Sequence, residues 1–266
     1  AAAPVITAEG VIRHVVAGLG GGEASANSPD GFKAGDPATP VRGIATTAMA
    51  TMTVLKQAVA QKTNLVLTYE PTFFGRNEAA SANDPIHIAK REFIEKNGLV
   101  VYRLRDRWQA RPQRDMVTGL AAALGWAARR VKPEDSVYEI PVVTAEAAVA
   151  HIRAKLALRA GLRAVGDRHA AVRRVLLFPG SMTPAVMWPR YSEVDMIVAG
   201  EVREWENTHY AADMFTAGER RALVTVGRVV SEEPGMRACA DWVRATVKGV
   251  PVRWIPAGDP YWSPAA

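Results

Sequence analysis

The chain has 266 residues, of which 48% are hydrophobic and 23% are charged, and its formal net charge is +6. This composition is ordinary for a soluble globular protein of one large domain or two modest ones. No apolar run approaches the roughly 20 residues of a membrane span, so we expect no membrane partner. The basic residues occur in short groups broken by apolar residues, with no nucleic-acid-binding motif. The charge therefore indicates solvated surface or attraction to small anions, and no nucleic-acid partner.

A single cysteine, Cys239, excludes an intrachain disulfide, and its place in a helical pattern of apolar residues predicts a small core residue. The chain begins Ala-Ala-Ala-Pro without methionine, as a protein does after removal of a signal peptide. Avoidance of cysteine also suits an oxidising compartment. We therefore expect a periplasmic or secreted protein, with a cytoplasmic one as the alternative.

Strands and helices alternate along the first half of the chain. Residues 11–17 end a first amphipathic helix, and residues 18–38, rich in Gly, Ser, Asn and Pro, predict a loop. The pattern then predicts strands over 41–45, 65–67 and 99–104, and helices over 46–60, 116–124 and between Asp84-Pro85 and Asn97-Gly98.

The second half repeats this alternation. It predicts strands over 140–143, 172–178, 195–199, 222–226 and 250–255, with helices over 145–159 and 208–215 and one through Trp242. Pro179-Gly180-Ser181 predicts a tight turn. The whole pattern predicts an α/β protein with largely parallel sheets in two similar lobes. We place the first lobe, which carries the site, at 1–135 plus 222–266, and the second at 136–221.

Polar side chains follow four of the predicted strands. They are Tyr69 with Glu70, the cluster 105–109, the acids Glu201, Glu204 and Glu206, and Arg228 with Glu232. Ligands bind at the carboxyl ends of parallel strands, so we expect these groups to converge. Carboxylates from separate strand ends indicate a hard-cation site or a general acid–base pair. The plain alternative is that each acid caps the helix that follows it.

Several of these stretches together resemble a known family. Residues 35–47, 65–74, 200–206 and 227–233 are similar to the Nif-three-like family, which is also catalogued as GTP cyclohydrolase I type 2-like. The resemblance covers most of the chain in the right order. It implies a ring-shaped hexamer with a dinuclear metal centre. It also implies five ligands: two consecutive histidines, an aspartate, a late histidine and a glutamate.

Most of these ligand positions hold other residues here. The paired histidines fall on Tyr69 and Glu70, the aspartate near Gln109 or Asp106, the late histidine on Arg228 and the glutamate on Glu232. Two divalent metals and Arg228 would bring five positive charges against two carboxylates. Each unpaired like-charge contact at about 4 Å costs roughly 4 kcal/mol. We therefore expect no dinuclear centre, and the alternatives are one iron, manganese or zinc ion and a metal-free pocket in which Arg228 pairs with an acid.

Three functions remain open at this stage. The first is a hydrolase-type enzyme for a small anionic or cyclic amide-containing molecule, with Glu232, Arg228 and Tyr69 as catalytic residues. Substrate contacts would come from Arg105, Asp106, Glu201, Glu204 and Glu206, and metal ligands from Glu70, Glu232, Tyr69 and Gln109. The second is a ligand-binding or scaffold protein that kept the ring and lost the chemistry, and the third is a metal-handling protein. We favour the hydrolase, mostly on the resemblance.

Overall fold

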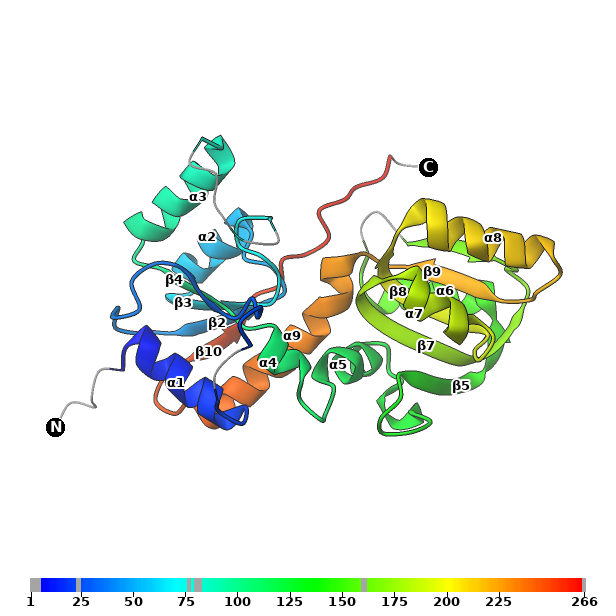
Figure 1. Cartoon of the computed structure of the whole chain (residues 1–266), viewed down its shortest axis with the longest axis horizontal. Coiled ribbons are helices and arrows are strands. Elements are labelled where there is room, and N and C mark those ends of the chain that lie inside the picture. The colour runs from blue at the N-terminus through cyan, green and yellow to red at the C-terminus, as the bar shows by residue number, and fades with distance from the viewer. Residues whose placement is uncertain (1–5, 23–24, 76–77, 79–82, 159–161, 265–266) are drawn as a thin grey trace. The chain divides into compact units, whose positions relative to one another are not determined.

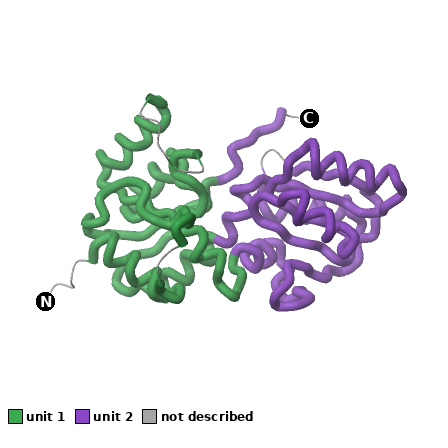
Figure 2. Tube along the Cα trace, in the orientation of Figure 1, with its two compact units in different colours: residues 1–115, 236–257 green, residues 116–235, 258–266 purple. Residues whose placement is uncertain are grey.

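A computed structural model describes residues 6–22, 25–75, 78, 83–158 and 162–264 (Figure 1). The chain forms two compact units, which Figure 2 colours separately. Unit 1 consists of residues 1–115 and 236–257, and unit 2 of 116–235 and 258–266. The division drawn from the sequence placed 116–135, 222–235 and 258–266 in the first lobe, whereas here they are part of unit 2. Within the described ranges, every helix is too short or too polar to cross a bilayer.

Unit 1 is built on a mixed sheet with the strand order β1-β4-β3-β2-β10. The strands β10, β2, β3 and β4 run parallel, and β1 pairs antiparallel with β4 at one edge. Their bounds are Gly31–Ala34 (β1), Ile44–Thr47 (β2), Leu65–Thr68 (β3), Val100–Arg103 (β4) and Val252–Trp254 (β10). Every residue of β2, β3 and β4 is buried, as expected for parallel strands covered on both faces.

Helices cover both faces of this sheet (Figure 1). Helices α2 (Met52–Ala60) and α3 (Pro85–Lys96) pack on one face through a buried apolar cluster. Helices α1 (Ala8–Gly18) and α9 (Arg228–Thr246) lie on the other face, and α4 (Asp106–Gln109) follows β4. Three of these helices begin at a polar cap: the side chains of Thr7, Thr51 and Asp84 accept backbone N–H bonds at the starts of α1, α2 and α3.

Unit 2 contains a second mixed sheet with the order β5-β7-β8-β9-β6. Its centre, β7-β8-β9, is parallel, and the edge strands β5 and β6 are antiparallel to their neighbours. The bounds are Val137–Thr144 (β5), Arg163–Gly166 (β6), Ala171–Met182 (β7), Met196–Val202 (β8) and Ala222–Thr225 (β9). The two sheets confirm the α/β fold expected from the alternation of strands and helices.

Two apolar clusters fill unit 2, one on each face of its sheet. Helices α5 (Asp115–Ala123) and α6 (Ala145–Lys155) contribute to the first cluster, beside the short η1 (Ala127–Arg129). Helices α7 (Pro184–Tyr191) and α8 (His209–Thr216) contribute to the second cluster. The π-helical turn η2 (Glu204–Thr208) leads into α8. Both clusters draw on alternate residues of the same strands, which is the two-residue period of a sheet with two covered faces.

Local structure differs from the sequence prediction at several points. The predicted loop 18–38 contains β1, whose Gly and Ala residues hide a strand from pattern analysis. The helix predicted over 46–60 starts at Met52, because residues 44–47 pair in the sheet and Thr51 caps the helix. The predicted helix 145–159 ends at Lys155, and residue 159 lies outside the described residues. The predicted tight turn at Pro179-Gly180-Ser181 is a β-bulge inside the long strand β7.

Candidate functional site

The carboxyl end of β3 presents Tyr69 and Glu70 at the edge of the unit 1 sheet. Thr68 fixes this end, because its hydroxyl accepts a hydrogen bond from the Ala50 N–H at 3.1 Å and donates to the Glu70 carbonyl at 3.1 Å. The Glu70 N–H donates to the Ala48 carbonyl at 2.8 Å. Both side chains are nearly buried, at 4% and 5% exposure. A carboxylate and a phenol are therefore held in defined positions by the strand ends around them.

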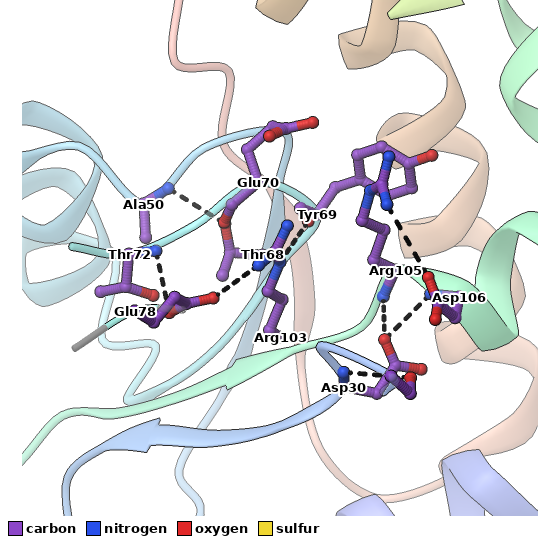
Figure 3. A network of polar contacts seen from close by, with 11 residues as sticks. Asp30, Ala50, Thr68, Tyr69, Glu70, Thr72, Glu78, Arg103, Arg105 and Asp106 are labelled. Carbon is purple, nitrogen blue, oxygen red and sulfur yellow. Dashed lines mark hydrogen bonds and ion pairs between the residues drawn. The ribbon is translucent and has the colours of Figure 1, made fainter. Parts of the chain in front are cut away.

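A buried ion pair supports the backbone of this tip from behind. Arg103 Nη1 lies 2.9 Å from Glu78 Oε1, and both side chains are almost inaccessible. Arg103 also donates from Nε to the Tyr69 carbonyl at 3.0 Å, and the Thr72 N–H donates to Glu78 Oε2 at 3.2 Å. Figure 3 shows the Glu70 carboxylate pointing away from this ion pair. The pair therefore positions the backbone and leaves the Glu70 carboxylate for other contacts.

The Tyr69 phenol lies among three residues that follow β4. Its O–H donates to Gln109 Oε1 at 3.0 Å. The Arg105 guanidinium lies 5.4 Å from the centre of its ring, and Figure 3 shows the two side chains next to each other. Arg105 Nη1 is 3.8 Å from an oxygen of Asp106, whereas the buried Arg105 Nε has no hydrogen-bond partner among the described residues. An unsatisfied buried N–H of a cation is costly, so its presence beside a phenol favours an oxygen ligand there.

Asp30 fixes the start of the segment that carries Arg105 and Gln109. Its carboxylate accepts three consecutive backbone N–H bonds, from residues 105, 106 and 107, at 2.7, 2.9 and 3.1 Å. The Arg107 guanidinium donates to the carbonyls of Gly21 and Gly22, each at 2.8 Å. Arg107 therefore holds this segment against the backbone of Gly21 and Gly22.

In unit 2, the bulge of β7 brings its backbone against the start of α9. The Gly180 N–H donates to Ser231 Oγ at 2.9 Å, and the Ser231 hydroxyl donates to the Arg228 carbonyl at 2.6 Å. A Cβ on Gly180 would lie 3.0 Å from Glu232 Oε1, and one on Gly200 would lie 2.4 Å from Ser231 Oγ. The two glycines are therefore required for the close approach that seats Glu232.

Arg228 joins two of the predicted acids. Its Nη1 is 3.0 Å from Glu201 Oε1, and its Nε is 3.7 Å from Glu232 Oε1. Glu232 is only 2% exposed, whereas Glu201 lies at the surface at the end of β8. A guanidinium stays protonated at any physiological pH, so Arg228 is a permanent cation shared by the two carboxylates.

The remaining predicted acids have other partners. Glu204 lies 3.3 Å from Arg163, and Glu206 lies 2.9 Å from Arg203, so neither pairs with Arg228. The predicted site residues thus form one group in each unit. The first group contains Tyr69, Glu70, Arg105, Asp106 and Gln109, and the second contains Glu201, Arg228 and Glu232.

Sequence reasoning missed four charged residues behind the tip: Asp30, Glu78, Lys90 and Arg103. One signal was available for Lys90, because it stands four residues before the buried Ile94 and therefore shares its face of α3. The pairing of Glu78 with Arg103 has no sequence signal, since the two residues are 25 positions apart.

Comparison with known proteins identifies the class of fold and then the family. The model of the Duf34/NIF3 (NGG1p interacting factor 3) family matches residues 21–260. The chain belongs to this family, which confirms the resemblance seen in the sequence. It has no match among curated proteins.

Solved structures share the fold over nearly the whole chain. A Bacillus cereus protein related to NIF3 has a TM-score of 0.77 at 13% identity, covering 97% of this chain and 99% of that one. A Staphylococcus aureus hypothetical protein has a TM-score of 0.75 at 14% identity, covering 98% and 100%. The protein ybgI, described as of unknown function, has a TM-score of 0.75 at 20% identity, covering 96% and 100%.

The donors at the ligand positions implied by the resemblance do not fit a dinuclear metal centre. The Tyr69 O–H donates to Gln109 Oε1, and Arg228 is a cation that lies 3.7 Å from Glu232. Two divalent ions would need several anionic or neutral nitrogen and oxygen donors in place of these groups. Among the described residues, no three His, Cys, Asp or Glu side chains gather as a metal-binding group.

Proposed function

We propose that this chain is a hydrolase-type enzyme for a small anionic or cyclic amide-containing molecule, and that the Tyr69–Glu70 tip carries the reaction. The observation that supports this most is the buried Nε–H of Arg105, which lies beside the Tyr69 ring and has no hydrogen-bond partner in the described part of the chain. The residue after Tyr69 is Glu70, whose carboxylate is nearly buried. An N–H donor, a phenol and a carboxylate are the groups that amide hydrolysis needs.

Glu70 acts first as the base and then as the acid, and the two donors stabilise the oxyanion between these steps. Glu70 removes a proton from water, and the resulting hydroxide attacks the amide carbonyl carbon. The tetrahedral oxyanion accepts hydrogen bonds from Arg105 Nε and from the Tyr69 O–H, which turns from Gln109 toward the substrate. The C–N bond then breaks, and the proton held by Glu70 passes to the leaving nitrogen. No step requires a metal ion.

The test measures ring opening of 5-oxoproline and dihydroorotate, which combine a cyclic amide with a carboxylate, in the presence of a chelator. Glu70→Gln removes the base but keeps the side-chain shape, so turnover should fall by about 10² to 10⁴-fold. Glu92→Gln, on the exposed side of α3, is the matched control and should keep full activity. A Glu70→Gln variant as active as the wild type would exclude Glu70 as the base.

Binding without catalysis is the second candidate, and the pairing in unit 2 favours it. Arg228 ion-pairs with both Glu201 and Glu232, so a permanent cation that cannot ligate a metal stands where the resemblance implies the late histidine. If 5-oxoproline raises the melting temperature of the wild type while no ring-opened product forms over hours, the chain is a binding protein. Product formation that is lost in Glu70→Gln supports the enzyme.

Three expectations from the sequence remain predictions. Assembly into a hexamer follows from the family resemblance, and light scattering on the purified chain tests it. The single metal ion, with Glu70, Glu232, Tyr69 and Gln109 as candidate ligands, is tested by metal analysis of protein prepared without chelator. Periplasmic export is tested by fractionating cells that express the natural gene.

A further inference from the structure

The buried charges behind the Tyr69–Glu70 tip do not balance. Lys90 is 1% exposed and Arg103 is 5% exposed, and both are cations. Glu78 is the single carboxylate that a described contact joins to this group: it pairs with Arg103 at 2.9 Å and interacts with Lys90 through space. The group therefore carries one excess positive charge. A buried charge without a partner is strongly unfavourable, so an excess cation indicates a missing anion.

Among the described residues, the polar atoms of Lys90 and Thr72 have fewer hydrogen-bond partners than they can take. The ammonium has three N–H donors, and among the described residues it bonds one acceptor, the Thr72 carbonyl. The hydroxyl of the same threonine is fully buried and has no partner in the part of the chain that the structure describes. Within the described ranges, two donors of the ammonium and the hydroxyl of Thr72 therefore remain without a partner, and carboxylate or phosphate oxygens would satisfy both groups.

An exposed aromatic ring covers this position. Lys90 Nζ lies 4.5 Å from the centre of the Phe74 ring, and 52% of Phe74 is exposed to solvent. The backbone of Phe74 has φ of 64°, a left-handed conformation that is strained for a bulky residue. The ring also stacks on His87 at 6.0 Å between ring centres. A ring held over a cation at a cost in backbone strain, and half exposed to solvent, is placed to be displaced by a better partner.

We propose that Lys90 and Thr72 form an anion-binding subsite closed by Phe74, which takes the carboxylate or phosphate group of a small ligand. The anion replaces the Phe74 ring at the ammonium and accepts a hydrogen bond from the Thr72 hydroxyl. The subsite begins two residues after Glu70, so its role in substrate recognition rests on the proposed function. It would bind the anionic group of the substrate.

The surroundings of Lys90 make anion binding sensitive to pH. Burial lowers the pKa of Lys90 to about 8, and the charge of Glu78 opposes this shift. The other charged or titratable groups nearby are Arg103, Arg91 over the Phe73 ring, and His87 against both phenylalanines. A bound anion favours the charged ammonium, so affinity should fall as the pH rises through about 8.

The experiment titrates the full chain with inorganic phosphate and, separately, with acetate, by calorimetry at constant ionic strength and pH 7. The wild type should bind at least one of the two saturably. Lys90→Met should weaken that binding at least about tenfold, since a hydrogen-bonded charge is lost. Thr72→Val should weaken it less, and Phe74→Ala should strengthen it, because the ring no longer competes. Lys96→Met, on the exposed end of the same helix, should bind as the wild type does.

Three results would overturn the subsite: no saturable binding of either anion by the wild type, unchanged affinity in Lys90→Met, or unchanged affinity in Thr72→Val. The threonine variant decides the matter if Lys90→Met does not fold. Glu70→Gln separates this inference from the proposed function. It should lose turnover yet bind the anion normally. A fully active Glu70→Gln that binds the anion refutes the role of Glu70 as the base and leaves the subsite standing. Loss of turnover in Glu70→Gln, with no anion binding by the wild type, supports the base and refutes the subsite.

Discussion

Arg103 and Glu78 form a salt bridge at 2.9 Å with side-chain exposures of 5% and 3%. The same arginine holds the Tyr69 carbonyl through Nε, and the same glutamate holds the Thr72 N–H. The pair thus ties both ends of the turn 69–72 to β4. Removing either partner disturbs the turn and leaves a buried charge behind, and the remaining charges differ in the two cases.

The first prediction compares Glu78→Gln with Arg103→Met. Without Glu78, two buried cations, Arg103 and Lys90, remain with no carboxylate. Without Arg103, Glu78 remains balanced by Lys90. We therefore expect Glu78→Gln to lower the free energy of unfolding by about 3–5 kcal/mol, and Arg103→Met to lower it by less. Urea unfolding followed by circular dichroism measures both values.

An exposed pair provides the control for this comparison. Glu146 lies against Arg168, and 55% and 67% of the two side chains are exposed. Glu146→Gln should leave the unfolding midpoint almost unchanged, as most surface pairs do. Equal losses for Glu78→Gln and Arg103→Met would mean that Lys90 does not compensate Glu78, and that the charge count behind the tip is incorrect.

The second prediction concerns the pH dependence of stability. The folded-state pKa of Lys90 is about 8, below the ordinary lysine value of 10.5. Between these values the unfolded chain binds more protons than the folded one, so stability should rise with pH from about 8 upward. The buried Cys239 opposes this above about pH 9, because burial raises the pKa of its thiol. The difference between wild type and Lys90→Met isolates the lysine: it should change between pH 7 and 9, as measured by urea midpoints, and a constant difference would contradict the assignment.

The alternation of buried strands and helices was sufficient to predict the class of fold. Strands such as 65–68 and 196–202 are short apolar runs with turn residues on both sides, so the sequence alone indicates them. The edge strands β1 and β6 were missed because Gly31–Ala34 and Arg163–Gly166 lack an apolar run. Their pairing comes from antiparallel contacts with β4 and β9, which depend on the assembled sheet.

The candidate site was predictable only in part, for a related reason. Tyr69 and Glu70 stand at the end of a buried strand before a proline, and that position is visible in the sequence. The partners of Arg228 depend on the bulge at Gly180, which the sequence suggests only as a turn. The buried cations Lys90 and Arg103 read as ordinary surface residues, since a charge in a helix or at a strand end is usually solvated.

The third prediction concerns the glycines that seat Glu232. A Cβ added to Gly200 would lie 2.4 Å from both a backbone oxygen and Ser231 Oγ. A Cβ added to Gly180 would lie 3.0 Å from Glu232 Oε1, and one added to Gly218 would have no atom within 4 Å among those described. Gly180 and Gly218 both have left-handed φ, at 88° and 98°, so Gly218→Ala measures the backbone strain alone, at about 1 kcal/mol. We expect the loss of stability to increase from Gly218→Ala to Gly180→Ala to Gly200→Ala in thermal unfolding. An equal loss at positions 180 and 218 would show that Glu232 moves aside at no cost.

The fourth prediction concerns the cation that Glu201 and Glu232 share. In the wild type, Arg228 supplies that charge permanently, so EDTA and added manganese or zinc should leave the melting temperature unchanged. Arg228→Gln removes the positive charge beside the two carboxylates and keeps a polar side chain at position 228. This variant should melt at a lower temperature than the wild type. Manganese or zinc should restore part of the loss, because a divalent ion can bind the carboxylate oxygens that no longer contact a guanidinium. Arg163→Gln, which removes an exposed partner of Glu204, is the matched control and should respond to neither treatment. If EDTA destabilises the wild type, a resident metal contributes to the fold, and Arg228 does not replace it.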